Sequence, residues 1–234
     1  MVFNVRPNQV FLKDDTTLKL IASLVEGDIL EIGGGHGELT KHLLGRGKIT
    51  VIEIDAKLAV KLKKLNETKL IVGDALKESF DGYDFVVGNI PYNISSQIII
   101  KFLDSNSMRA IFTIQRELAE RMVAEPCSKD YSRLSVRVQS AGKCRILRVL
   151  PPVFFSPEPK VFSAVVEIEK TKKNALSDFD KRIVDLIFQH KNQNIGKVLK
   201  REGFKTTEDP VFLKKARCVD INDIKKISSL VEFI

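Results

Sequence analysis

Several kinds of residue are scarce in this sequence, and their scarcity argues against several classes of protein. The 234 residues include no tryptophan and only three tyrosines, so stacking on a planar ligand would depend mainly on phenylalanine and tyrosine. No apolar run reaches the roughly 18 residues of a membrane-spanning helix, and Met1 to Arg6 lack the apolar segment of a signal peptide. We therefore expect a soluble, cytoplasmic protein with no membrane partner.

Cysteine and histidine are also too sparse to suggest a structural metal site. The three cysteines, Cys127, Cys144 and Cys218, are far apart, odd in number and form no CxxC motif. This pattern argues against a disulfide framework and a zinc site, and it predicts a reducing compartment. No second histidine or cysteine lies near His36, so we expect a loop residue there rather than a metal ligand.

The chain carries an excess of positive charge, which has two possible explanations. The formal net charge is +8, which is a weak indication of a polyanion such as nucleic acid. A solvated, lysine-rich surface of the kind found in heat-adapted proteins explains the charge equally well. The length and the hydrophobic content of 44% fit one domain of ordinary size with a small appendage.

Short apolar runs alternate with amphipathic stretches from the N-terminal region to Gln115. We expect strands at residues 28–32, 48–53, 69–72, 85–88 and 110–114, and helices at 36–44, 56–65 and 96–103. Strands that alternate with helices predict an α/β fold with an open, Rossmann-like parallel sheet covered on both faces. Ligands of such folds bind beyond the carboxyl ends of the strands.

The pattern changes after Gln115. Helices are expected at 116–124 and 132–141, and strands at 145–150 and 163–169, with a proline-rich loop between these two strands. The polar segment 170–174 is the best candidate for a domain boundary. It predicts a Rossmann-like domain at 1–172 and a small C-terminal helical domain at 173–234.

A glycine-rich segment closes the first expected strand. Gly33, Gly35 and Gly37 follow Glu31 at alternate positions, and glycines there allow the backbone to approach a ligand closely. A dinucleotide fingerprint would need a further glycine where Glu38 stands, so NAD is disfavoured. The spacing suits a nucleoside that carries an amino-acid tail.

Two acids follow the next two expected strands. Glu53 is placed to accept hydrogen bonds from both ribose hydroxyls. Asp74 is placed to accept one from an adenine amino group. Together with the glycine segment, they predict a binding site for S-adenosylmethionine.

The segment Asn89-Ile90-Pro91-Tyr92 follows the fourth expected strand. The side-chain oxygen of Asn89 and the carbonyl of Ile90 can both accept hydrogen bonds from one exocyclic amine. Tyr92 offers a face on which a base can stack. The alternative is an ordinary strand-to-helix turn, in which Asn and Pro are common.

With these motifs the chain resembles the KsgA-type rRNA adenine N6,N6-dimethyltransferase family, most closely its archaeal and eukaryotic branch. The resemblance runs from about Pro7 to Glu169. Its motifs are 9–12, 31–37, 52–55, 73–75, 88–96, 115–117, 120–121, 131–136 and 155–161.

The resemblance implies a methyltransferase that modifies two adjacent adenosines near the 3′ end of small-subunit rRNA. The implied cofactor is S-adenosylmethionine, with S-adenosylhomocysteine as product, and no metal. The implied partner is a pre-ribosomal 30S-type particle. The sequence does not indicate an oligomeric state, so we expect a monomer by default. The cofactor would be held by Val10, Leu12, Gly33, Gly35, Glu53, Asp74, Ala75 and Asn89.

The implied reaction requires a nucleophile to be positioned rather than a covalent intermediate. We expect Asn89 and the Ile90 carbonyl to bind the adenine N6 hydrogens, and Tyr92 and Phe155 to sandwich the extruded base. Phe155 could instead be a core residue of the proline-rich loop.

The sequence departs from the family pattern at several positions. Val10 stands in place of a polar residue, so only its backbone could serve the cofactor. Gly34 replaces a proline and Phe162 replaces an aspartate. The segment 188–194 is less basic than in relatives.

Basic residues could contact the phosphates of RNA. In the appendage they are Lys197, Lys200, Arg201, Lys205, Lys214, Lys215 and Arg217, and Arg116, Arg121, Arg133 and Arg137 could line the approach. Solvated helix faces explain these charges equally well.

Three other functions stay open at this stage. One is a large-subunit rRNA methyltransferase of the antibiotic-resistance type, and another is a DNA adenine methyltransferase. The third, from a different class, is a ribosome-assembly factor whose catalysis is secondary.

Overall fold

The computed structural model describes residues 9–65, 67–171 and 175–233, and its contacts divide the chain into two compact units. The first, here the sheet unit, comprises Met1–Ala119 and Arg145–Glu169. The second, the helical unit, comprises Glu120–Cys144 and Lys170–Ile234. The domain boundary predicted at residues 172 and 173 lies outside the described residues and stays a prediction. The contacts add that Glu120–Cys144 groups with the C-terminal segment.

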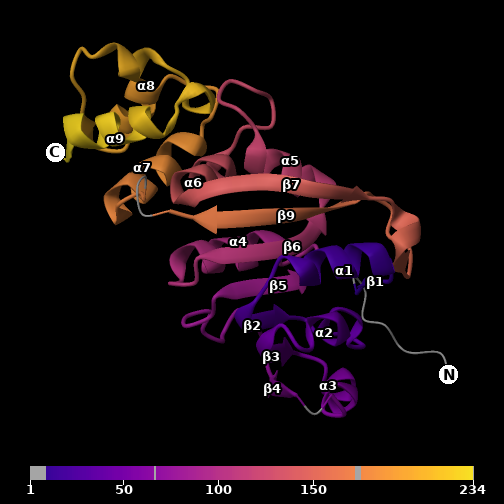
Figure 1. Cartoon of the computed structure of the whole chain (residues 1–234). Coiled ribbons are helices and arrows are strands. Elements are labelled where there is room, and N and C mark those ends of the chain that lie inside the picture. Colours follow the sequence, from indigo (N-terminus) through magenta and orange to yellow (C-terminus); the bar gives the residue numbers. More distant parts are fainter. Residues whose placement is uncertain (1–8, 66, 172–174, 234) are drawn as a thin grey trace. The chain divides into compact units, whose positions relative to one another are not determined.

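A seven-stranded sheet forms the centre of the sheet unit (Figure 1). Its order is β4 (Thr68–Val72), β3 (Gly47–Glu53), β2 (Gly27–Ile32), β5 (Phe85–Asn89), β6 (Arg109–Gln115), β9 (Ser163–Lys170) and β7 (Gly142–Leu150). The first five of these strands are parallel, and β9 runs antiparallel to β6. The expected α/β class and the expected strands are confirmed, with ends that differ by a few residues.

The strand order sets the place of the site. From β2 the chain moves outward through β3 and β4, then returns to the other side of β2 as β5 and continues to β6. The direction of winding therefore reverses between β2 and β5. In open α/β sheets this switch point leaves a crevice at the carboxyl ends of the two strands. The glycine segment after β2 and the Asn-Ile-Pro-Tyr segment after β5 meet at this crevice.

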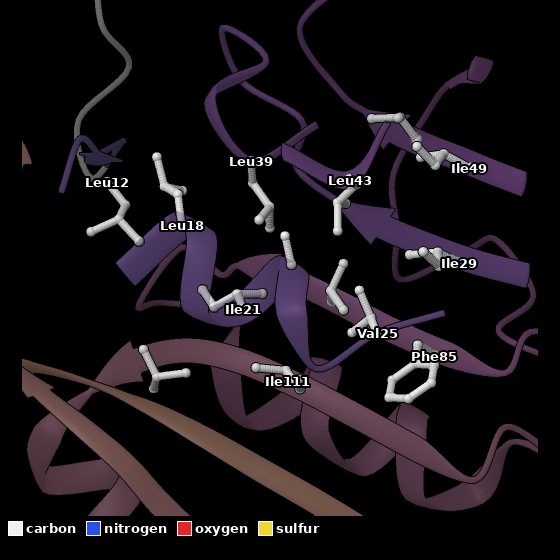
Figure 2. Packing of buried hydrophobic residues seen from close by; sticks show 14 of the residues in the cluster. Leu12, Leu18, Ile21, Val25, Ile29, Leu39, Leu43, Ile49, Phe85 and Ile111 are labelled. Carbon is white, nitrogen blue, oxygen red and sulfur yellow. The ribbon is translucent and has the colours of Figure 1, made fainter. Parts of the chain in front are cut away.

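Helices cover both faces of the sheet because each strand presents apolar side chains in both directions. On one face α1 (Asp15–Ser23) and α2 (Glu38–Leu43) pack into a cluster that contains Ile29, Val87 and Ile111, and Figure 2 shows several of its members. On the other face α4 (Ser95–Asp104) places Phe102 edge-on against Phe112 of β6, with ring centroids 5.9 Å apart. The helix α3 (Ala56–Leu62) connects β3 to β4.

The helix α1 is not predicted by the sequence pattern described above. It begins where the side chain of Asp14 accepts a hydrogen bond from the Thr17 backbone N–H, which satisfies one of the unpaired amides of a helix start. Leu18, Ile21 and Ala22 then lie on one face at helical spacing and are buried. This helix closes the apolar face of the sheet next to the glycine segment.

Two short strands tie the N-terminal segment to the sheet unit. β1 (Phe11–Leu12) pairs with β8 (Phe155–Ser156), so that Leu12 lies opposite Phe155. The Lys13 N–H also donates to the Phe154 carbonyl at 2.8 Å. The pairing holds the residues before Leu12 beside the crevice.

The helical unit has its own hydrophobic core. Its helices are α6 (Arg133–Ala141), α7 (Asp178–Phe188), α8 (Ile195–Arg201) and α9 (Ile221–Leu230), and α5 (Arg116–Val123) enters it from the sheet unit. The buried cluster includes Ile183, Leu199 and Ile227. Tyr131 is buried among them and donates a hydrogen bond to the Val219 carbonyl at 2.9 Å. Burial, with smaller contributions from Asp220 and Asp223, raises the pKa of Tyr131 to about 12.

The structure corrects the interpretation of the cysteines, which argued against a disulfide framework and for a reducing compartment, because one disulfide is present. Cys127 and Cys218 are joined by a disulfide, with Cα atoms 4.2 Å apart, across a sequence separation of 91 residues. Both cysteines belong to the helical unit, and such a distant pair has no recognisable spacing in the sequence. The cysteines therefore no longer support a reducing compartment. No described helix combines the length and apolar character that crossing a membrane requires.

Candidate active site

The glycine segment turns sharply between β2 and α2. Gly33 and Gly35 have φ angles of 73° and 58°, a left-handed conformation that favours glycine. Gly34 is needed for another reason, because a Cβ atom there would lie 2.5 Å from Cγ1 of Val51. The backbone of the segment is therefore packed closely against Val51 of β3, and the Gly33 N–H donates to the Ile52 carbonyl at the end of the same strand.

Glu53 at the end of β3 is buried, and backbone amides fix its carboxylate. Its Oε2 atom accepts from the Gly35 N–H at 2.9 Å, and Oε1 accepts from the Asp55 N–H at 2.8 Å. Each carboxylate oxygen has capacity for a second hydrogen bond. Asp74, after β4, uses Oδ1 to accept from the Leu76 N–H at 3.0 Å. Both acids are thus held in place as hydrogen-bond acceptors.

An open hollow of about 630 Å³, its mouth included, lies beyond the ends of β2 to β5. Seven of the eight predicted cofactor residues line it: Val10, Gly33, Gly35, Glu53, Asp74, Ala75 and Asn89. The eighth, Leu12, is buried at 3% exposure and lines a smaller hollow behind the first. The structure therefore brings seven of the eight predicted residues together around the open hollow. Leu12 lies behind it, in the wall of the smaller hollow.

Eight further residues line the hollow that sequence reasoning did not assign to the cofactor. They are Gln9, Phe11, Ile32, Ile52, Ile54, Gly73, Pro91 and Ile94. Ile54 is 52% exposed although it is apolar, and such a side chain beside Glu53 suits contact with a planar ring. Its position directly after a strand-ending acid is a signal that the sequence offers.

Asn89 ends β5 with its amide held in one orientation. Its Nδ2 donates to the carbonyl of Val10 at 2.7 Å. Its Oδ1 is buried and meets no hydrogen-bond partner within the described part of the chain. A buried amide oxygen without a partner is costly, by about 1–3 kcal/mol. The backbone of Val10 thus orients Asn89, whose oxygen is left to accept from a ligand.

The residues after Asn89 form a tight turn into α4. The Ile90 N–H donates to Thr113, and the Pro91 carbonyl accepts from the Ile94 N–H and the Ser95 hydroxyl. Tyr92 is half-buried, and its hydroxyl lies 2.7 Å from Oγ of Ser163, the first residue of β9. Burial raises the pKa of Tyr92 above its ordinary value, and the hydrogen bond between its hydroxyl and Ser163 holds the ring in place.

Phe155 lies in the hydrophobic core in this structure. It is 3% exposed and belongs to the cluster that contains Leu12 and Val87. The position corresponds to the core alternative considered from the sequence. Contact between Phe155 and a target base stays a prediction, and it would require the β1–β8 pair to shift.

Glu31 lies on β2 beneath the glycine segment and is 1% exposed. The pKa of Glu31 is raised to about 8, mainly by burial and to a smaller extent by the negative charges of Glu38 and Glu53, while hydrogen bonding to Thr40 acts in the opposite direction. It lines the smaller hollow together with Asn89 and Thr113. The sequence places Glu31 before the glycine segment but gives no sign of this burial.

The predicted RNA-contacting residues of the helical unit are mostly exposed. Lys197, Lys200, Arg201 and Lys205 lie at its surface, whereas Arg217 is half-buried. Lys214 is bound to Asp223 at 2.8 Å and Arg133 to Asp185 at 3.4 Å. Among the residues that the structure describes, no group of three potential ligands could hold a metal ion.

The sheet order, the glycine turn, the two fixed acids and the Asn-Ile-Pro-Tyr turn define a methyltransferase of the Rossmann-like class. The family profile of ribosomal RNA adenine dimethylase matches residues 2–233. The chain belongs to this family.

Solved structures agree with the assignment. A crystal structure of a dimethyladenosine transferase from Plasmodium falciparum is 26% identical and superimposes with a TM-score of 0.82 over 95% of this chain and 100% of that one. The 23S rRNA methyltransferase ErmE is 25% identical, with a TM-score of 0.73 over 94% of this chain and 98% of its own.

Curated relatives are more similar in sequence. A protein of Pyrobaculum aerophilum named "Probable ribosomal RNA small subunit methyltransferase A" is 45% identical over 177 residues, which cover 74% of this chain and 77% of the relative. A protein of the same name from Methanopyrus kandleri is 39% identical over 215 residues, covering 84% of this chain and 77% of the relative.

Proposed function

We propose that this protein is a small-subunit rRNA adenine N6,N6-dimethyltransferase that uses S-adenosylmethionine. The observation that carries the proposal is the buried Oδ1 atom of Asn89, which is oriented by Val10 and lies beside a hollow with two fixed acids. The substrate would be two adjacent adenosines near the 3′ end of the rRNA, modified during ribosome biogenesis.

The residues of the hollow fit S-adenosylmethionine. Glu53 would accept hydrogen bonds from the ribose hydroxyls, because both of its oxygens retain accepting capacity. Asp74 would accept from the adenine amino group, with Ile54 against the ring. Gly33 and Gly35 leave room for the amino-acid tail. The bound cofactor supplies a methyl group activated by a sulfonium, so no metal is required for activation.

The chain's own residues would position the nucleophile. The adenine N6 lone pair is delocalised into the ring, so the amine is a weak nucleophile. Hydrogen bonds from N6–H to Asn89 Oδ1 and the Ile90 carbonyl would favour a tetrahedral nitrogen. Tyr92, fixed by Ser163, would stack on the extruded base, with Phe155 on the other side after a shift of β8. Catalysis would then come from alignment and preorganised acceptors.

The helical unit would supply affinity for rRNA. Its exposed lysines and arginines would contact phosphates, which gives a binding constant that falls as salt rises and carries little sequence choice. Residues 173–234 would form the core of this RNA-binding domain. We propose that the protein acts as a monomer on a pre-ribosomal 30S-type particle in the cytoplasm.

The small-subunit assignment rests on degree of similarity. The relatives that are 39–45% identical carry small-subunit names, whereas the 23S enzyme ErmE is 25% identical. The intact set of Glu53, Asp74, Asn89 and Tyr92 supports catalysis rather than binding alone. An assembly role can accompany this chemistry.

The test is methyl transfer from labelled S-adenosylmethionine to small ribosomal subunits that lack the modification, followed by mass analysis of the adenosines. We expect N6,N6-dimethyladenosine at two adjacent positions near the rRNA 3′ end. Subunits that already carry the modification serve as the control and should accept no label. Transfer to large-subunit rRNA instead, or tight binding without transfer, would refute the proposal.

A further inference from the structure

A second, smaller hollow lies directly behind Asn89. It measures about 360 Å³ with its mouth included. Its walls are mostly apolar and include Leu18 and Ile21 of α1, which are labelled in Figure 2. Four polar side chains also line it: Glu38 at the start of α2, and three from the sheet, Glu31, Asn89 and Thr113. We call it the inner chamber.

The sheet register explains why these three side chains meet. Glu31 on β2 lies opposite Val87 of β5, and Asn89 lies two residues further along the same strand. Thr113 on β6 lies opposite Asn89. Side chains two residues apart on a strand share a face, so all three project from the face that α1 covers. The inner chamber is therefore built by three neighbouring strands.

Each of the three side chains has an unsatisfied polar atom. Glu31 Oε2, Asn89 Oδ1 and Thr113 Oγ1 are all buried without a hydrogen-bond partner among residues 9–65, 67–171 and 175–233. A few such atoms occur in any protein, but three around one hollow point to bound water, which typically makes about three hydrogen bonds to otherwise unsatisfied groups. The inner chamber shares Phe11, Gly33 and Gly35 with the open hollow.

The proposed reaction leaves a proton to be removed. The N6–C bond forms as the C–S bond breaks, and the bonding pair stays on sulfur. The nitrogen then carries one proton too many and must lose it before its lone pair can attack a second methyl group. Asn89 and the Ile90 carbonyl accept hydrogen bonds but do not take a proton at neutral pH.

We infer that water reaches from the open hollow past Asn89 into the inner chamber, that this water takes the proton directly from the methylated adenine nitrogen, and that the carboxylate of Glu31 receives the proton from the water. Asn89 Oδ1 accepts a hydrogen bond from the water and so positions it, but does not carry the proton. Glu31 would pass the proton to solvent through the open hollow once the product leaves. This inference deepens the proposed function and rests on it. It makes Glu31 a proton acceptor that works through water, and it makes Thr113 a positioning residue.

The environment of Glu31 suits a proton acceptor better than the environment of Glu53 does. With its pKa raised to about 8 by burial, Glu31 is poised near working pH, where a general base is most effective. The charged groups that act on it are Glu38, at the start of α2, and Glu53 on β3, and both raise its pKa. Leu18 and Ile21 on α1, and Asn89 and Thr113 on the neighbouring strands, carry no charge. Glu53 is already bound by two backbone amides.

The test measures kcat against pH for the full-length protein, with S-adenosylmethionine and unmodified small subunits. In the wild type, kcat should rise about tenfold per pH unit as Glu31 ionises, then level off above about pH 8. Glu31→Gln should lower the plateau on the order of 100-fold and abolish the rise. The KM for S-adenosylmethionine should change by less than about threefold, and Glu31→Asp should restore part of the rise.

Two further variants separate a chemical role from a structural one. Thr113→Val removes a hydroxyl from the inner chamber and should lower kcat by roughly tenfold while the pH dependence stays, because the acceptor is intact. Asp28→Asn changes the same charge at the opposite, exposed end of β2 and should leave kcat unchanged. A Glu31→Gln protein with wild-type kcat and the wild-type pH profile would overturn the inference.

A second readout does not depend on activity. A carboxyl whose pKa is raised on folding contributes stability below its ordinary pKa and loses it as pH rises through the folded value. The free energy of unfolding of the wild type should therefore fall between about pH 4.5 and pH 8, and this fall should be absent in Glu31→Gln. If the wild type transfers no methyl group, the proposed function fails and the acceptor role with it, although this titration would still report the proton held by Glu31.

Discussion

The sheet unit and the helical unit are stabilised and equipped in different ways. In the sheet unit, the residues that carry the chemistry are fixed by backbone groups: Glu53 by two amides and Asn89 by the Val10 carbonyl. In the helical unit, the exposed basic residues are held by other side chains or extend into solvent, as with Lys214 on Asp223. The site is rigid in one unit and the charged surface is adaptable in the other.

The difference has a physical origin. Parallel strands end at one edge, so residues far apart in sequence converge there and share the rigidity of the sheet. The helical unit has a smaller hydrophobic core than the sheet unit. A disulfide between residues 91 positions apart in the sequence also cross-links it. Catalysis should therefore be most sensitive to single atoms in the sheet unit, whereas changes in the helical unit should alter stability and salt dependence.

The largest effect is expected from Asn89→Ala. It removes the oriented acceptor from the end of β5, and loss of one preorganised group typically costs a factor on the order of 100 to 1,000 in kcat. Single-turnover methyl transfer would measure the loss, and calorimetric binding of S-adenosylhomocysteine would show whether the hollow is intact. Asn93→Ala, four positions later in the exposed part of the turn, is the matched control and should retain activity.

Removal of the disulfide should have the next largest effect, confined to the helical unit. Cys218→Ser should lower the stability of that unit by about 2–4 kcal/mol, because a long loop is no longer closed in the unfolded chain. Thermal unfolding with and without reductant would measure this. Cys144→Ser, which leaves the disulfide in place, is the control. An equal loss in both variants would contradict a stabilising role for the Cys127–Cys218 pair.

Glu53→Gln should weaken cofactor binding and have a smaller effect on kcat. The amide retains one oxygen but presents a donor where the carboxylate accepts, so we expect a loss of about 1.5–3 kcal/mol in binding, or roughly 10- to 100-fold in Kd. Titration of S-adenosylhomocysteine would measure it. Glu26→Gln, an exposed acid before β2, should bind normally. A raised KM with little change in kcat would sharpen the assignment of Glu53 to the cofactor.

The sequence predicted the sheet and most of the site because both follow from short-range patterns. Alternating apolar runs predict the strands, and an acid or an asparagine directly after a run predicts a side chain at the carboxyl edge. Glu53, Asp74 and Asn89 were found in this way, and all three line the hollow. The family resemblance added Val10 and Leu12, which no local pattern indicates.

What the sequence did not predict depends on long-range pairing. Leu12 and Phe155 lie opposite each other in strands of two residues, too short to leave a periodic pattern, and both are buried. The link between Cys127 and Cys218 requires two distant segments to fold together. The inner chamber exists only because β2, β5 and β6 align Glu31, Asn89 and Thr113 in register. Such features require the three-dimensional structure.

The smallest effect is expected from the basic surface of the helical unit. Lys197 and Lys200 are exposed on α8, so the double change to Gln should leave folding and cofactor binding unchanged. If both contact phosphates, the slope of log affinity against log salt should become shallower by about 1.4, since each contact with a single strand contributes about 0.7. Filter binding to small-subunit rRNA at several salt concentrations would measure this slope. Lys57 and Lys61 on α3 of the sheet unit provide the control pair. An unchanged slope for the α8 pair would assign those lysines to solvent and shift the RNA contact to other residues.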